Sequence, residues 1–143
     1  TVPRGVYRCS DGLFVGISTS SDSIAARVVH LLGFDGDDRF TTFAGRIANR
    51  EIIEAAMEAW FAQRTQAEAL AIFQEIEAAA GPILSMEDIE KDPHYIAREA
   101  VITVEGTPMQ GLIARLSATP GAVKWRGRAT DADGDAIRKT GWN

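Results

Sequence analysis

The chain of 143 residues has very little of what metal centres and disulfides require: one cysteine, Cys9, and two histidines. A single cysteine cannot form an internal disulfide, and with two histidines it cannot complete a Cys-rich zinc site. We therefore predict no bound metal. Sparse cysteine also fits a reducing compartment, and we expect a cytoplasmic protein.

Long apolar runs and an excess of basic residues are also missing. No apolar run approaches the ~18 residues that a membrane-spanning helix needs, and no basic, apolar leader opens the sequence. Fifteen Lys and Arg stand against 20 Asp and Glu, giving a net charge of -5. That charge disfavours nucleic acid as a partner. We expect a single globular domain that binds neither a membrane nor nucleic acid.

The common nucleotide and hydrolase motifs are absent: there is no phosphate loop, no dinucleotide glycine fingerprint and no G-x-S-x-G elbow. Asp131, Asp133 and Asp135 alternate like the start of a calcium loop. That loop needs glycine at its sixth position and glutamate at its twelfth. Here Gly134 is fourth and Trp142 is twelfth, so a solvated acidic segment is the better interpretation.

The two histidines and one basic cluster are the remaining candidates for chemistry. His30 falls at the end of a predicted helix and His94 in the first turn of another, and neither has a second ligand at metal spacing. Surface or capping roles are predicted for both. Residues 124–128, Lys-Trp-Arg-Gly-Arg, can contact a phosphate-bearing ligand or simply be solvated; the short length favours solvation.

The first third of the chain predicts a hairpin followed by a helix. Residues 6–9 and 13–17 are rich in strand-forming side chains and flank Asp11-Gly12, which favours a type I′ turn. A Ser- and Thr-rich stretch then offers several helix caps. Apolar residues follow at helical spacing up to a stop at Gly33, namely Ile24, Val28, Leu31 and Leu32.

Two further helices are the strongest local predictions. Residues 39–49 predict a short helix with Phe40, Phe43 and Ile47 inward, and Asn49 is expected to cap the next helix. That helix places on one side Ile53, Ala56, Met57, Trp60 and Phe61. A capping box of Thr65 and Glu68 starts a third helix, predicted to run to Gly81 with an apolar face of Ala69, Ile72, Phe73, Ile76 and Ala80.

The remaining residues predict a fold of the α+β class. Ser85 with Asp88 begins one brief helix, and Asp92-Pro93 begins another. Residues 100–104 and 111–116 read as strands. We expect them to join the N-terminal hairpin in one small antiparallel sheet, with the helices packed against it.

Several phrases, in their order and spacing, carry a resemblance to a known family. The most specific is residues 81–89, Gly-Pro-Ile-Leu-Ser-Met-Glu-Asp-Ile, followed by Asp92-Pro93-His94 and Arg98. Residues 117–120 read Ser-Ala-Thr-Pro. With Val2–Gly5, Tyr7–Gly12, Leu32-Gly33, Asp38–Phe40, Arg46 and Asn49, these phrases resemble the family III CoA-transferases, which include formyl-CoA transferase and carnitine CoA-transferase.

The resemblance implies a part of a larger enzyme. Such enzymes have a large Rossmann-like domain and a smaller α+β domain, and the likeness places residues 1–120 in the small domain. Residues 121–143 would return toward the missing large domain. The catalytic aspartate, which forms a mixed anhydride, belongs to that large domain, so no catalytic residue is expected here. The first residue, Thr1, is not a methionine, which fits an excised domain.

The resemblance also implies partners. Coenzyme A enters as a substrate rather than as a bound cofactor, together with acyl-CoA and carboxylic acid substrates. Full-length members are interlocked homodimers, so the small domain packs against its own large domain. We expect a well-packed core around Trp60, Phe61 and Phe73, and exposed tryptophans in the tail, Trp125 and Trp142.

Thr19 and Ser20 are the candidate substrate-binding residues, as a wall of the acyl pocket. The alternative is that they only cap the first helix. In the related α-methylacyl-CoA racemases a Glu-Pro pair follows the second strand, and Thr19 stands where that glutamate would be. A hydroxyl cannot relay an α-proton as a carboxylate can, so a transferase is favoured. The glycine run that some members carry before the hairpin is not present next to Gly5. A non-enzymatic α+β binding module remains the alternative from another class.

Overall fold

The computed structural model describes residues 1–142. Its contacts divide the chain into two units, Thr1–Ile83 and the part from Leu84 onward. Each unit is described by itself. The boundary at residue 120 concerns the domain arrangement of the family and stays a prediction.

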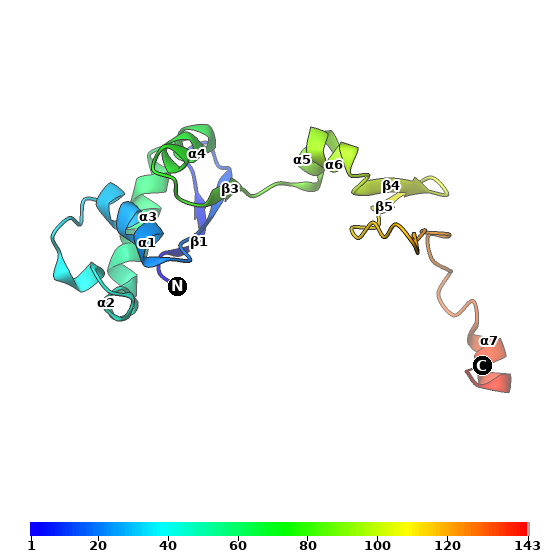
Figure 1. The fold of residues 1–143 in the computed structure, drawn as a ribbon. Coiled ribbons are helices and arrows are strands. Elements are labelled where there is room, and N and C mark those ends of the chain that lie inside the picture. Colours follow the sequence, from blue (N-terminus) through cyan, green and yellow to red (C-terminus); the bar gives the residue numbers. More distant parts are fainter. Residues whose placement is uncertain (143) are drawn as a thin grey trace. The chain divides into compact units, whose positions relative to one another are not determined.

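A three-stranded antiparallel sheet forms one layer of the first unit (Figure 1). Its strands are β1 (Arg4–Arg8), β2 (Phe14–Ser18) and β3 (Ala80–Pro82), in the order β1-β2-β3. The predicted hairpin is confirmed, but its turn is not type I′. The amide of Gly12 donates to the Cys9 carbonyl at 3.0 Å, and within this turn only Gly12 has a positive φ, 85°. This is a three-residue loop that ends in a left-handed glycine.

Helical segments connect β2 to β3 in the first unit. They are α1 (Asp22–Leu31), the 3-10 helix η1 (Asp38–Phe40), α2 (Phe43–Ala48), α3 (Arg50–Ala62) and α4 (Gln66–Glu75). Gly33 ends the first helical segment with a φ of 78°, as predicted. The capping box of Thr65 and Glu68 is present in full at the start of α4.

Two local expectations about these helices are wrong. The third predicted helix, α4, ends at Glu75, because Glu77 takes a positive φ of 52° and turns the chain so that residues 80–82 pair with β2. Asn49 lies at the start of α3 but makes no side-chain cap. Its side-chain Nδ2 instead donates to the Gly45 carbonyl of α2 at 2.9 Å.

The core of the first unit lies between the sheet and α1, α3 and α4. Tyr7 of β1 stacks on Phe61 of α3, with ring centroids 5.1 Å apart and planes 5° apart. Phe61 and Phe73 are buried, and Trp60 packs edge-on against both. The remaining buried side chains of the cluster include Val15, Ile17, Val28, Phe40, Ile53 and Met57. The predicted core around the three aromatic residues is therefore found.

The inward face of α2 was predicted wrongly. Phe43 and Ile47 are 46% and 48% exposed, whereas Arg46 between them is 2% exposed. The helix is only six residues long and follows a buried Phe40, so it turns its cationic residue inward, where backbone carbonyls accept its N–H groups.

The second unit contains α5 (Met86–Lys91), α6 (Pro93–Ala97), β4 (Val101–Val104), β5 (Thr107–Gln110) and α7 (Gly134–Thr140). Ser85 and Asp88 form the predicted capping box, and the Asp92 carboxylate accepts from the backbone amides of His94 and Tyr95. Pro93 occupies the first turn of α6.

The strand pairing in this unit corrects the predicted sheet. Strand β4 pairs with residues 107–110 and not with 111–116. Glu105 and Gly106, with φ of 49° and 76°, make a two-residue turn that brings Pro108 opposite Thr103. The hairpin therefore forms its own two-stranded sheet. The α+β class with small antiparallel sheets is confirmed, whereas one shared sheet is not.

The tail tryptophans are exposed, Trp125 by 59% and Trp142 by 88%. Among residues 1–142, the helices are all too short or too polar to cross a membrane.

Candidate functional site

Thr19 and Ser20 lie in the turn between β2 and α1. Thr19 is buried, and its Oγ1 donates to the Pro3 carbonyl at 2.7 Å. Ser20 is exposed. The residue that caps α1 is Ser21, whose Oγ accepts from the backbone amide of Ile24 at 3.3 Å. The alternative that both residues only cap α1 is thus not what the geometry shows.

These two residues line a hollow of about 270 Å³ in the first unit. The other lining residues are Thr1, Val2, Ser21, Asp22, Phe43 and Arg46. We call this hollow the N-terminal cleft. Its walls combine hydroxyl groups, one ion pair and the exposed ring of Phe43.

Arg46 holds the floor of the N-terminal cleft together. Its Nε donates to the Val2 carbonyl at 3.1 Å and its Nη1 to the Phe40 carbonyl at 3.3 Å. Its Nη2 pairs with the Asp22 carboxylate, whose side chain is 73% exposed. In the sequence, Arg46 stands out only as part of the family resemblance. Its partners lie 44, 6 and 24 residues away along the chain, so no local pattern announces it.

The N-terminal cleft can bind oxygen atoms but offers little for proton transfer. Among its lining residues, the one carboxylate, Asp22, is paired with Arg46. Two reactive groups elsewhere in the first unit favour their neutral forms: burial raises the pKa of Tyr7 to about 12 and also raises the pKa of the Cys9 thiol. The cleft is suited to positioning a ligand rather than to activating a nucleophile.

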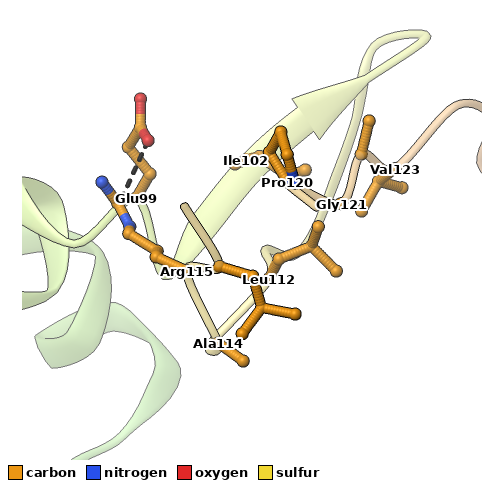
Figure 2. Close-up of a pocket in the computed structure, with 10 residues that line it drawn as sticks. Glu99, Ile102, Leu112, Ala114, Arg115, Pro120, Gly121 and Val123 are labelled. Carbon is orange, nitrogen blue, oxygen red and sulfur yellow. Dashed lines mark hydrogen bonds and ion pairs between the residues drawn. The ribbon is translucent and has the colours of Figure 1, made fainter. Parts of the chain in front are cut away.

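Figure 2 shows a second hollow, of about 360 Å³, in the unit that begins at Leu84. The Arg115 guanidinium and the Glu99 carboxylate, 2.9 Å apart, form an ion pair at one side of it. Leu112 and residues 120–123 line the rest, so the Ser-Ala-Thr-Pro phrase ends at this hollow. Its charged residues neutralise each other, which makes it a poor site for a charged ligand.

The other charged candidates from the sequence are also engaged. Arg126 pairs with Glu105 at 3.4 Å, and Arg128 pairs with Asp133. The His30 Nδ1 lies 2.6 Å from an Asp35 oxygen on the surface. Asp131 and Asp135 both pair with Arg138. Within residues 1–142, no group of three His, Cys, Asp or Glu side chains is placed to hold a metal ion.

Comparison with known proteins identifies the family to which the chain belongs. A family model described as CoA-transferase family III matches residues 1–133. The chain belongs to CoA-transferase family III. It is 31% identical over 135 residues to a succinyl-CoA–D-citramalate CoA-transferase from Chloroflexus aurantiacus. That match covers 89% of this chain but 34% of the relative, so the chain spans about a third of the relative's length.

Solved structures of similar fold show the same partial coverage. A CAIB/BAIF family protein from Brucella suis is 30% identical with a TM-score of 0.69, and the match covers 96% of this chain and 37% of that one. A Mycobacterium tuberculosis protein, 20% identical, also has a TM-score of 0.69, over 87% of this chain and 35% of that one. The second likeness concerns the fold alone.

Proposed function

We propose that this chain is the small-domain part of an acyl-CoA transferase, which moves coenzyme A between carboxylic acids. Residues 1–120 would form the small domain, and residues 121–143 would lead back toward a large domain. The observation that carries the proposal is the family match over residues 1–133. The name of the Chloroflexus relative, with a CoA thioester and a free acid, supports the reaction class.

The reacting aspartate would lie outside this chain. Its carboxylate would attack the acyl-CoA carbonyl and the carbon–sulfur bond would break. Coenzyme A would leave as thiolate, and the acyl group would stay on the aspartate as a mixed anhydride. The partial coverage of the relatives supports this division, because the match spans 34% of the Chloroflexus enzyme. Coenzyme A is a substrate in this scheme.

The chain itself would supply a wall of the acid-binding pocket at the N-terminal cleft. The Thr19 hydroxyl uses its proton in the bond to Pro3, so it can offer only lone pairs to a ligand. Ser20 is exposed, and its hydroxyl can donate to a carboxylate oxygen. Of the two candidates, Ser20 is therefore the better substrate contact.

A transferase is favoured over a racemase at the same position. Thr19 is a buried hydroxyl bound to a backbone carbonyl, and a racemase needs a carboxylate that passes an α-proton. Within residues 1–142, Asp22 is the one carboxylate that lines the N-terminal cleft, and it is paired with Arg46.

Exposed apolar side chains support packing against a large domain and a second subunit. Val6, Phe14 and Ile83 of the first unit are 58%, 42% and 49% exposed, and both tail tryptophans are exposed. Exposed large apolar side chains are common at interfaces, where a partner covers them. We propose that the full-length protein is a homodimer in which these side chains are covered.

The test uses the reading frame that contains this chain. CoA transfer from an acyl-CoA to a free acid is followed by chromatography for the longer product and for the 143-residue chain. The longer protein should transfer CoA and the chain alone should not. Ser20→Ala in the longer protein should raise the KM for the acid with little change in kcat. Ser10→Ala, an exposed serine outside the cleft, is the matched control. Transfer by the chain alone, or a natural frame that begins at Thr1, would overturn the proposal.

A further inference from the structure

A third hollow, of about 410 Å³, lies in the second unit among α5, α6 and the β4–β5 hairpin. Its volume falls in the range of roughly 300–1,000 Å³ typical of small-molecule sites. Met86 and Ile89 come from α5, Tyr95 from α6, and Leu112 and Ile113 follow β5. We call it the α5–β5 pocket.

The pocket has one charged side chain among residues 1–142, that of Arg98. No aspartate or glutamate of those residues lines it, although the whole chain carries a net charge of -5. The Arg98 Nη2 donates to the Ile113 carbonyl at 3.2 Å, which holds the guanidinium at the pocket. A guanidinium has five N–H donors, so donors remain for a ligand.

Arg98 differs in this respect from its neighbour in the same unit. Arg115 is paired with Glu99 at 2.9 Å (Figure 2). Among residues 1–142, Arg98 forms no ion pair with a carboxylate, and its one side-chain hydrogen bond is to a neutral carbonyl. Its charge is therefore open to an anion, and a carboxylate can meet a guanidinium through two parallel hydrogen bonds.

Three of the lining side chains are apolar and well exposed. Met86, Leu112 and Ile113 are 62%, 43% and 73% exposed. A cation beside apolar side chains is complementary to an amphiphile with an anionic head. The head then meets the opposite charge, and the apolar chain meets apolar side chains.

We infer that the α5–β5 pocket binds a monocarboxylate with an unbranched apolar chain. The carboxylate lies on Arg98, and the chain lies along Met86, Leu112 and Ile113. This goes beyond the proposed function, which assigns a substrate contact to Ser20 in the first unit. A carboxylate is favoured over a phosphate ester because its single negative charge matches the single charge of Arg98, whereas a phosphate monoester carries close to two.

The test titrates octanoate into the 143-residue chain, with binding measured by calorimetry and located by NMR shifts. Shifts should appear at Arg98 and residues 110–113. Octanoate should bind at least about tenfold more tightly than 1-octanol, which lacks the charge, and than acetate, which lacks the chain. Arg98→Gln should weaken octanoate binding about tenfold. Arg98→Lys keeps the charge but loses the two parallel hydrogen bonds, so it should bind octanoate less tightly than the unaltered chain and more tightly than Arg98→Gln. Arg138→Gln, the same change at an arginine that lies outside the pocket and pairs with Asp131, should leave octanoate binding unchanged.

Four results would overturn the inference: no octanoate binding at millimolar concentration, equal affinity for 1-octanol, unchanged affinity in Arg98→Gln, or shifts confined to residues 1–83. The comparison of octanoate with 1-octanol uses the unaltered chain, so it decides the question even if a variant does not fold. Every readout is binding rather than CoA transfer. The outcome is therefore separate from that of the proposed function.

Discussion

Replacing Arg46 by methionine should destabilise the first unit strongly. Methionine keeps an unbranched apolar side chain in the space that Arg46 fills, but it removes every donor. The buried carbonyls of Val2 and Phe40 then lose the partners that lie 3.1 and 3.3 Å away. A buried polar group left without a partner costs about 1–3 kcal/mol, so two such carbonyls give an expected loss of about 3 kcal/mol.

The ion pair with Asp22 adds little to this figure. The Asp22 side chain is 73% exposed, and water can solvate it when its partner is removed. Exposed pairs contribute about 0–1 kcal/mol. Asp22→Asn should therefore cost less than about 1 kcal/mol, which makes it the matched control for the role of charge.

Urea unfolding followed by Trp60 fluorescence measures both variants. Trp60 is half-buried in the core of the first unit, whereas Trp125 and Trp142 are exposed and report little. With an m-value of about 1.5 kcal/mol per molar urea, a loss of about 3 kcal/mol lowers the midpoint by about 2 M. An equal fall of the urea midpoint in Asp22→Asn and Arg46→Met would contradict the prediction. The ion pair, and not the hydrogen bonds to the two carbonyls, would then stabilise the first unit.

Three further predictions concern single side chains. Tyr7→Phe should raise the free energy of unfolding or leave it unchanged, because the buried Tyr7 hydroxyl has no hydrogen-bond partner among residues 1–142; a loss above about 1 kcal/mol in urea unfolding would contradict this. The amide and hydroxyl of Thr65 lower the pKa of Glu68 below its ordinary 4.5, so the charged form is favoured in the fold. This stabilisation is present above pH 4.5 and is lost as the pH falls through the lowered pKa, so Glu68→Gln should flatten the pH dependence of Tm in that acid range. Gly111→Ala should destabilise the second unit, since a Cβ there would collide with the Glu99 carbonyl oxygen, whereas Gly81→Ala has open space; equal Tm losses would refute this.

Features set by a few adjacent residues could be predicted from the sequence. The capping boxes at Thr65 and Ser85 and the left-handed stop at Gly33 all appear in the structure, because their hydrogen bonds and φ values are decided within four residues. Strand β3 could not be predicted in the same way. Residues 80–82 are Ala-Gly-Pro, poor strand formers, and they are extended because they pair with β2, more than 60 positions earlier.

The position of strand β5 could have been predicted from the residues of the turn before it. Residues 107–110 contain a proline, which argued for a connection. Glu105-Gly106 supplies the two positive φ values of a tight turn and fixes the strand directly after it. A two-residue turn with glycine at its second position indicates that the strand begins at the next residue.

The candidate site was predicted in part. Thr19 and Ser20 do line a cleft, but the residue that organises the cleft, Arg46, could not be ranked from sequence. A buried arginine between two exposed apolar residues contradicts the usual helical pattern, and only contacts with the distant Val2 and Asp22 explain it. The unpaired state of Arg98 likewise depends on which acids lie near it in space.

Two hydrogen bonds connect the wall of the cleft to the N-terminal segment. Thr19 donates to the Pro3 carbonyl and Arg46 donates to the Val2 carbonyl, while Arg46 also pairs with Asp22 at the start of α1. Ser20 lies between Thr19 and Asp22, and both of these residues belong to this network. Removal of residues 1–3 should therefore change the position of Ser20 in the cleft.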